Sequence, residues 1–390
     1  MSNWPPSSAA SRLALPLTFR EKVNRFWLRV TEGLELSQLW SQFEKDARAS
    51  YRLYSRDLER KQAEEVRPGR KFFHVAQQFF WAVLEKLTPA RRLLLLLALI
   101  LLIFNPEFGW HSEGNLHIVS LDFRLYGGLL LFLLLILEVA DRVVMKRDLQ
   151  IAREIQEWLL PSEPPTVPGI EIAFHTRPAN TVAGDYYDVF ARPDRTAEEN
   201  RVLVAVADVA GKSIPAALLM ATFQASLRTL SMTQSSLSEL VTSINQYACT
   251  NSQGGLRFTT AFLSELDPAT RTLTYINAGH NAPMLCRKSG GLERLAAGGL
   301  PIGIKADAQY QSGRVVLAPG DWLVIFTDGV VEAMNTRGDE YGEQRLLADV
   351  ATGTDATPAE MMRRILASLD GFVGNTPQHD DVTCLLLKVV

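Results

Sequence analysis

The chain of 390 residues is longer than the ~100–200 residues of one typical domain, so its length predicts two or three units. Hydrophobic residues make up 47% of it and charged residues 21%, and the 40 basic side chains nearly balance the 43 acidic ones. This composition argues against a disordered chain and against a nucleic-acid-binding protein, and three cysteines are too few for a disulfide framework or a Cys-X-X-Cys metal site.

Residues 1–90 are predicted to form an N-terminal cytoplasmic helical region. After a Pro/Ser-rich opening, aromatic and aliphatic residues recur at helical spacing among many charges between 18 and 87. Helices that pack on one another have this pattern, and so do helices that lie on a membrane surface. The sequence leaves both open.

Two aliphatic runs at 93–104 and 125–140 raise the mean hydropathy to +0.02. Each is shorter than the ~20 apolar residues that span a bilayer, but both can be extended into their flanks. A buried core hairpin is the alternative, although a soluble core seldom uses so long an aliphatic run without a polar face. We expect a two-helix transmembrane hairpin over 91–141.

The charges around these runs predict an orientation. Arg91 and Arg92 precede the first run and three further basic residues follow the second within 142–147, whereas 105–124 contains one arginine and no lysine. By the positive-inside rule, both termini and the C-terminal domain are expected in the cytoplasm, in a multi-pass membrane protein.

A connecting helix is expected over 142–163. Its apolar residues recur at three- and four-residue steps, and it should end at Pro161. The stripe consists of Met145, Leu149, Ala152, Ile155 and Leu159. Such a stripe can pack on the next domain or pair with a second copy in a parallel coiled coil, and we favour the second, a homodimer formed through this helix.

Residues 164–390 are predicted to form one α+β domain. Short β-rich runs alternate with glycine-rich turns, and two helical stretches, Pro215–Leu230 and Pro358–Leu369, interrupt them.

Aspartates recur in this domain where an apolar strand ends. They lie in GDYYD (184–188), VAVADVAGK (204–212), VIFTDGVVE (324–332) and HDDVT (379–383). Each alone could be a helix cap or a turn residue. Together, carboxylates from separate strands can converge and bind two hard divalent cations, and Mn²⁺ or Mg²⁺ fits better than zinc because only His280 and His379 lie nearby.

Two further residues near these motifs could take part in chemistry. Lys212 precedes a helix begun by Pro215, where an anion can approach, so Lys212 could contact a substrate phosphate or be a solvated lysine. His280, in AGHN, could act as a general acid or could shape its loop.

The four segments, with INAGHNAP (276–283), GGLPIGI (298–304) and IAREIQEWLLP (151–161), resemble the SpoIIE/RsbU branch of the metal-dependent (PPM) serine/threonine phosphatases. The resemblance covers 149–390. It implies an α-β-β-α sandwich with two Mn²⁺ or Mg²⁺ ions at one end of the sheets. It also implies control by an N-terminal sensor through the connecting helix and the helix at 215–230.

Carried over residue by residue, the resemblance implies that Asp208 bridges both ions and that the carbonyl of Val209 is a further ligand. Asp328 and Asp380 would complete the shell of the second ion, and Asp185 would bind directly or through water. With Lys212, the residues Asp208, Asp328 and Asp380 form the expected catalytic set. Asp381 is an alternative or indirect metal ligand, and Asp188 is expected to be structural.

The resemblance implies hydrolysis of phosphoserine or phosphothreonine on an anti-anti-sigma (STAS-type) protein, in partner-switching control of a sigma factor in a bacterium. Together with the expected hairpin, this predicts a protein of the bacterial inner membrane. Two alternatives stay open. One is a membrane-anchored binding protein that has lost hydrolysis, although all the expected acidic positions are present. The other is a receptor whose domain acts on a small phosphorylated molecule, although no cluster of Arg and Lys near the motifs supports it.

Overall fold

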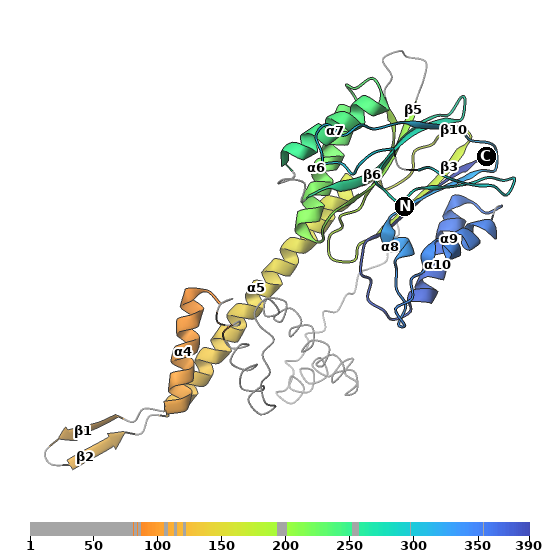
Figure 1. Ribbon diagram of the computed structural model, residues 1–390. Coiled ribbons are helices and arrows are strands. Elements are labelled where there is room, and N and C mark those ends of the chain that lie inside the picture. Colours follow the sequence, from red (N-terminus) through yellow and green to blue (C-terminus); the bar gives the residue numbers. More distant parts are fainter. Residues whose placement is uncertain are drawn as a thin grey trace, which may run out of the picture. The chain divides into compact units, whose positions relative to one another are not determined.

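The computed structural model describes residues 81, 84, 87–104, 108–112, 115–119, 122–192, 201–251, 257–296, 298–353 and 355–390. Nearly all of the helical region expected over 1–90 lies outside these residues. The chain divides into two compact units, Met1–Glu138 and Val139–Val390. Figure 1 labels the helices and several of the strands.

The first unit contains a helical hairpin. Helix α4 (Pro89–Phe104) packs on the first part of helix α5 (Phe123–Leu159), and strands β1 (Phe108–Ser112) and β2 (Asn115–Val119) pair between them. The helices approach closely at Gly127, where a Cβ atom would lie 2.8 Å from the Leu102 side chain.

The expectation that the hairpin spans a membrane is not confirmed. Within the described residues, no helix is both long enough and apolar enough to cross a bilayer. Helix α4 has 16 residues. At ~1.5 Å per residue it falls short of a hydrocarbon core ~30 Å thick. In α5, Arg124 and Glu138 bound the apolar run. The transmembrane assignment of 91–141 and the multi-pass localisation that depended on it therefore stay predictions.

Helix α5 joins two elements that the sequence analysis kept apart. It runs unbroken for 37 residues, because no proline lies between the aliphatic run and the expected connecting helix at 142–163. It ends at Leu159, close before Pro161 as expected.

The second unit contains two five-stranded antiparallel sheets. The first has the order β10-β7-β6-β5-β4, and the second has the order β3-β12-β11-β8-β9. The strands of the first are β4 (Tyr186–Arg192), β5 (Arg201–Val209), β6 (Thr259–Asp267), β7 (Thr272–Ala278) and β10 (Gly313–Val316). Those of the second are β3 (Ile170–Arg177), β8 (Met284–Cys286), β9 (Leu292–Arg294), β11 (Trp322–Phe326) and β12 (Val382–Val389).

Helices cover the outer face of each sheet (Figure 1). On the first sheet lie α6 (Ile214–Leu230) and α7 (Leu237–Asn251). On the second lie α9 (Gly342–Ala351) and α10 (Pro358–Val373), and the short helix α8 (Asp328–Val331) follows β11.

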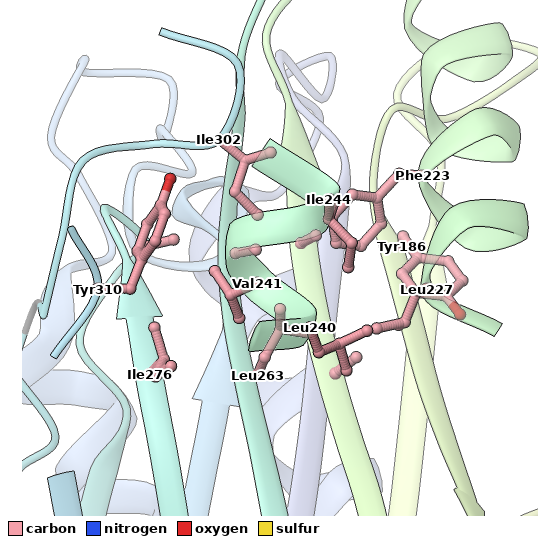
Figure 2. Packing of buried hydrophobic residues seen from close by; sticks show 14 of the residues in the cluster. Tyr186, Phe223, Leu227, Leu240, Val241, Ile244, Leu263, Ile276, Ile302 and Tyr310 are labelled. Carbon is pink, nitrogen blue, oxygen red and sulfur yellow. The ribbon is translucent and has the colours of Figure 1, made fainter. Parts of the chain in front are cut away.

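Strand β5 shows how the sequence produces these layers. All but its ends are apolar, because both faces of this central strand are buried. Leu203 and Ala205 face the helices α6 and α7, whereas Val204 and Val206 face the other sheet, which is the two-residue period of a strand. Figure 2 shows the helix-facing cluster, in which Phe223 of α6 packs on Tyr186.

The observed layers are therefore helix, sheet, sheet, helix. This confirms the predicted α-β-β-α sandwich of an α+β domain.

Candidate metal centre

The predicted ligands lie at one end of both sheets. There the start of β4 pairs with the end of β5, and the start of β12 pairs with the end of β11. The aspartates at these strand ends are Asp185, Asp208, Asp328, Asp380 and Asp381. The antiparallel pairing thus brings together residues that are far apart in the sequence.

Asp185 is buried and is held by a residue from the other sheet. It is 2% exposed, and the hydroxyl of Thr327 donates a hydrogen bond of 2.9 Å to its Oδ2. Burial raises the pKa of Asp185 well above its ordinary value, and the charge of Asp208 raises it further. The Thr327 hydroxyl also accepts a bond of 3.0 Å from the Thr383 N–H, which fixes its direction.

Asp208 is coupled to carboxylates that belong to the second sheet. Burial is the largest cause that raises its pKa to about 7, followed by the charges of Asp328, Asp380 and Asp381. Burial and the charge of Asp380 likewise raise the pKa of Asp328. This end of the sandwich therefore concentrates negative charge that a bound cation would neutralise.

Asp381 holds the loop that leads to Asp185. Its Oδ1 accepts the N–H of Ala179 at 2.7 Å, and its Oδ2 accepts the N–H of Gly184 at 2.6 Å. Both carboxylate oxygens are thus used by the backbone, which favours an indirect role over direct ligation.

Two glycines permit the close approach of these segments. A Cβ atom on Gly329 would lie 2.0 Å from the carbonyl oxygen of Asp381, and one on Gly184 would lie 3.2 Å from the carbonyl oxygen of Val209. A side chain at either position would push a candidate ligand away from the others. This steric requirement explains why a glycine stands next to an aspartate in two of the motifs, at Gly184-Asp185 and at Asp328-Gly329.

Lys212 lies at the site and contacts an expected ligand. Its Nζ is 2.9 Å from Oδ2 of Asp380 and donates a bond of 2.5 Å to the carbonyl of His379. Lys212 therefore lies at the candidate metal centre and forms an ion pair with one of the expected ligands.

His280 is almost fully buried. It is 5% exposed, Thr260 lies 3.0 Å from its Nδ1, and burial lowers its pKa to about 4 despite the nearby carbonyl of Phe326. A buried neutral imidazole of this kind supports its loop, which is the second of the two roles considered for it.

Asp188 has a structural environment, as expected. It is fully buried, accepts two hydrogen bonds of 2.7 Å from the Arg228 guanidinium and accepts a third from the Tyr186 hydroxyl. These bonds fasten α6 to β4.

The chemistry of the donor set fits a hard divalent cation, because it consists of carboxylate and carbonyl oxygens. The carboxylates are not arranged as a closed set of metal ligands in the part of the chain that the structure describes. Among the described residues, no three His, Cys, Asp or Glu side chains are grouped closely enough to hold an ion. Two of the carboxylates are engaged elsewhere, Asp380 by Lys212 and Asp381 by backbone N–H groups.

Three polar residues at this end were missed in the sequence analysis. Thr327 and Thr383 orient Asp185 from the second sheet, and Gln156 of α5 bonds to the backbone of Ala183. Thr327 directly precedes Asp328 in the TDG motif, which was an available signal. Gln156 lies in the IAREIQEWLLP segment, but nothing in the local pattern identifies its partner.

Two antiparallel sheets between two helical layers, with carboxylates gathered at one end of both sheets, define a PP2C-like phosphatase fold. The SiaA-PP2C domain of Pseudomonas aeruginosa has this fold, with a TM-score of 0.56, 22% identity and coverage of 64% of this chain and 98% of that one.

A family model matches part of the chain. Residues 198–390 match the model of Stage II sporulation protein E (SpoIIE), so this part of the chain is similar to the SpoIIE family.

Two curated relatives extend this result. The chain is 29% identical over 247 residues to Phosphoserine phosphatase RsbU of Bacillus subtilis, which covers 63% of this chain and 70% of RsbU. It is 26% identical over 274 residues to Protein IcfG of Synechocystis sp., which covers 64% of this chain. The chain spans 42% of the length of IcfG.

Proposed function

We propose that the chain is a metal-dependent phosphatase that hydrolyses phosphoserine or phosphothreonine on a regulatory protein. The observation that carries the proposal is the convergence of Asp185, Asp208, Asp328 and Asp380 at one end of the two sheets. The SpoIIE match and the likeness to Phosphoserine phosphatase RsbU support the same reaction.

Two Mn²⁺ or Mg²⁺ ions are the proposed cofactors. Asp208 would hold both ions, with the Val209 carbonyl, Asp185, Asp328 and Asp380 as the other ligands. When bound, such a pair lowers the pKa of a water molecule, so that hydroxide is available near neutral pH, and it neutralises phosphate charge.

The other residues have supporting tasks. Asp381 keeps the Ala179–Gly184 loop in place, and Thr327 fixes the direction of the Asp185 carboxylate. Lys212 exchanges its bond to Asp380 for one to the substrate phosphate, since its ammonium group is already beside the proposed ligands.

The proposed substrate is a phosphorylated protein of the STAS (anti-anti-sigma) type, in partner-switching signalling of a bacterium. The exposure of two residues of the site and the small size of the neighbouring cavity support a protein over a free nucleotide. Asp380 and Lys212 are exposed, and the cavity beside Asp380 measures about 100 Å³. Small-molecule pockets are typically ~300–1,000 Å³. A phosphorylated side chain presented by a protein surface fits such a shallow site.

A homodimer through α5 is also proposed, with a seam that differs from the predicted stripe. Leu149 and Leu159 of that stripe are partly buried by the chain's own second unit. Ile151, Ile155 and Trp158 are 44%, 48% and 80% exposed and follow the four- and three-residue steps of a coiled coil.

The activity can be tested on the purified full-length chain with p-nitrophenyl phosphate and Mn²⁺. Asp208→Asn and Asp328→Asn should each lower kcat/KM at least ~100-fold, because each removes a ligand of the proposed ions. Asp307→Asn is the matched control, since Asp307 is exposed outside the site, and it should match the wild type. A wild type that binds Mn²⁺ but hydrolyses neither this substrate nor phosphoserine would support the alternative of a binding protein without activity.

A further inference from the structure

Helix α5 makes a specific polar contact with the phosphatase unit at Gln156. This side chain is 6% exposed, although most of the neighbouring positions on the helix are open to solvent. Its Nε2 donates a bond of 2.8 Å to the Ala183 carbonyl, and its Oε1 accepts a bond of 2.9 Å from the Ala183 N–H. The Gln156 amide thus bonds to both the N–H and the carbonyl of Ala183. The two bonds together fix the position of Ala183 relative to helix α5.

Ala183 continues directly into the candidate metal centre. The next residue, Gly184, donates its N–H to Asp381 and lies against the carbonyl oxygen of Val209. Asp185 follows. The loop is therefore held from one side by Asp381 and from the other by Gln156, and a displacement of Ala183 would be transmitted to Asp185 and Val209.

The packing of α5 differs on the two sides of this contact. Beyond its C-terminal end, Leu160 packs against both apolar clusters of the first sheet, which anchors that end. Towards its N-terminus, a cavity of about 650 Å³ separates the helix at Leu149 and Arg153 from the loop at Thr181 and from Ile214 of α6. Gln156 lies between the anchored end and the cavity.

We infer that Gln156 is a positioning residue through which helix α5 sets Asp185 and the Val209 carbonyl in the geometry that binds the metal. The inference rests on the proposed function, because it assigns a task towards the same ions. A shift of the helix by one residue moves the amide by ~1.5 Å and turns it by ~100°, and either change breaks both bonds to Ala183.

The test compares the full-length wild type with Gln156→Met, which keeps the size of the side chain and removes both hydrogen bonds. Gln150→Met, at an exposed position of the same helix, is the matched control. Mn²⁺ affinity is measured by calorimetry, and hydrogen exchange of the Val182–Asp185 amides by mass spectrometry. Gln156→Met should bind Mn²⁺ at least ~10-fold more weakly, as expected when a group that orients ligands is lost, with faster exchange in the loop. Gln150→Met should match the wild type in both.

A purely structural role for Gln156 predicts a different result. The melting temperature would then fall, while the Mn²⁺ affinity of the folded protein stayed at the wild-type value, and this outcome overturns the inference. If Gln156→Met does not fold, Gln156→Glu replaces it, because it keeps the length and the acceptor but loses the donor. It should also weaken Mn²⁺ binding, and wild-type affinity would again contradict the inference.

Failure of the proposed function is recognised separately. In that case the wild type neither binds Mn²⁺ nor hydrolyses a phosphate ester. Hydrogen exchange then tests only whether Gln156 holds the loop at Ala183. Unchanged protection of the Ala183 amide in Gln156→Met would show that it does not.

Discussion

Asp185 and Asp208 are the carboxyl groups of the candidate metal centre whose pKa values are raised most. Burial raises the pKa of both, and the charges of neighbouring carboxylates add to the effect. The folded protein without ions therefore holds protons that the unfolded chain releases. In this respect a proton and a divalent cation are alternative ways to neutralise the same group of oxygens.

This competition predicts a pH dependence of stability. The folded-state pKa of Asp208, about 7, lies above its unfolded value of ~3.9. Its contribution to stability is therefore fully present below ~pH 4 and is lost as the pH rises through 7. In EDTA, the melting temperature should fall between pH 5 and pH 8, and Mn²⁺ should raise it more at pH 8 than at pH 5.

Asp208→Asn is the control for this experiment, because it removes the titrating group and should flatten the fall. A melting temperature in EDTA that rises from pH 5 to pH 8 would contradict the assignment of protons to this site.

Thr327 should matter through Asp185. Thr327→Val replaces the hydroxyl by a methyl group of similar size and removes the bond to Asp185, so Mn²⁺ affinity and kcat/KM should each fall ~10-fold. Thr327→Ser keeps the hydroxyl and should stay close to the wild type. Equal Mn²⁺ affinity in the Val variant would show that the hydroxyl does not orient the carboxylate.

Residues of the centre differed in how far they could be predicted. The aspartates were identifiable because each ends or begins an apolar strand, and such strand ends meet at one end of a sandwich. Thr327 and Gln156 were not, because their partners are 142 and 27 residues away in the chain and only the folded pairing brings them together. For His280, burial favours support of its loop over a role as general acid.

At the scale of elements, α6 is fastened to β4 by a charge pair. Asp188 is fully buried, and Arg228, which also lies 3.9 Å above the Phe190 ring, supplies its positive partner. The pair connects the helix beside the metal centre to the strand that begins just after Asp185. Loss of one partner leaves the other charge without compensation.

Arg228→Met should therefore destabilise the fold by about 3 kcal/mol, measured by urea unfolding, because it leaves a buried carboxylate unpaired. Arg153→Met is the control, since the exposed Arg153–Glu157 pair should contribute at most about 0.5 kcal/mol. Equal effects of the two substitutions would argue against Asp188 as a structural anchor.

The proposed seam of α5 predicts the oligomeric state. Ile151→Glu with Ile155→Glu places charges in the seam and should convert a dimer to a monomer in light scattering after gel filtration. Met145→Glu, at a more exposed apolar position on another side of the helix, should stay dimeric. A wild type that is monomeric at all concentrations would contradict the seam.

Dimerisation and the Gln156 contact can act together. At ~100° per residue, Gln156 lies ~130° around the helix from the centre of the seam, so α5 can bind a second copy and the Ala183 loop at the same time. The stripe predicted from the sequence combined residues of the seam with residues that face the phosphatase domain. A three- and four-residue spacing alone does not show which part of the protein each face of the helix contacts.

For the whole molecule, the layered domain was predictable and the hairpin only in part. The strand and helix patterns predicted an α+β domain, the resemblance to the PPM phosphatases implied its four layers, and the structure has both. The helical hairpin is present, but the helices are too short or too interrupted by charge to cross a membrane within the described residues.

The central claim is that the gathered carboxylates make the chain a metal-dependent phosphatase for a phosphorylated protein. Its most direct test is phosphate release from a phosphoserine-containing STAS-type protein by the full-length chain, with ATP as the competing substrate. We predict release with Mn²⁺, none in EDTA, recovery when Mn²⁺ is restored, and little release from ATP. Release that continues in EDTA, or that favours ATP, would contradict the account.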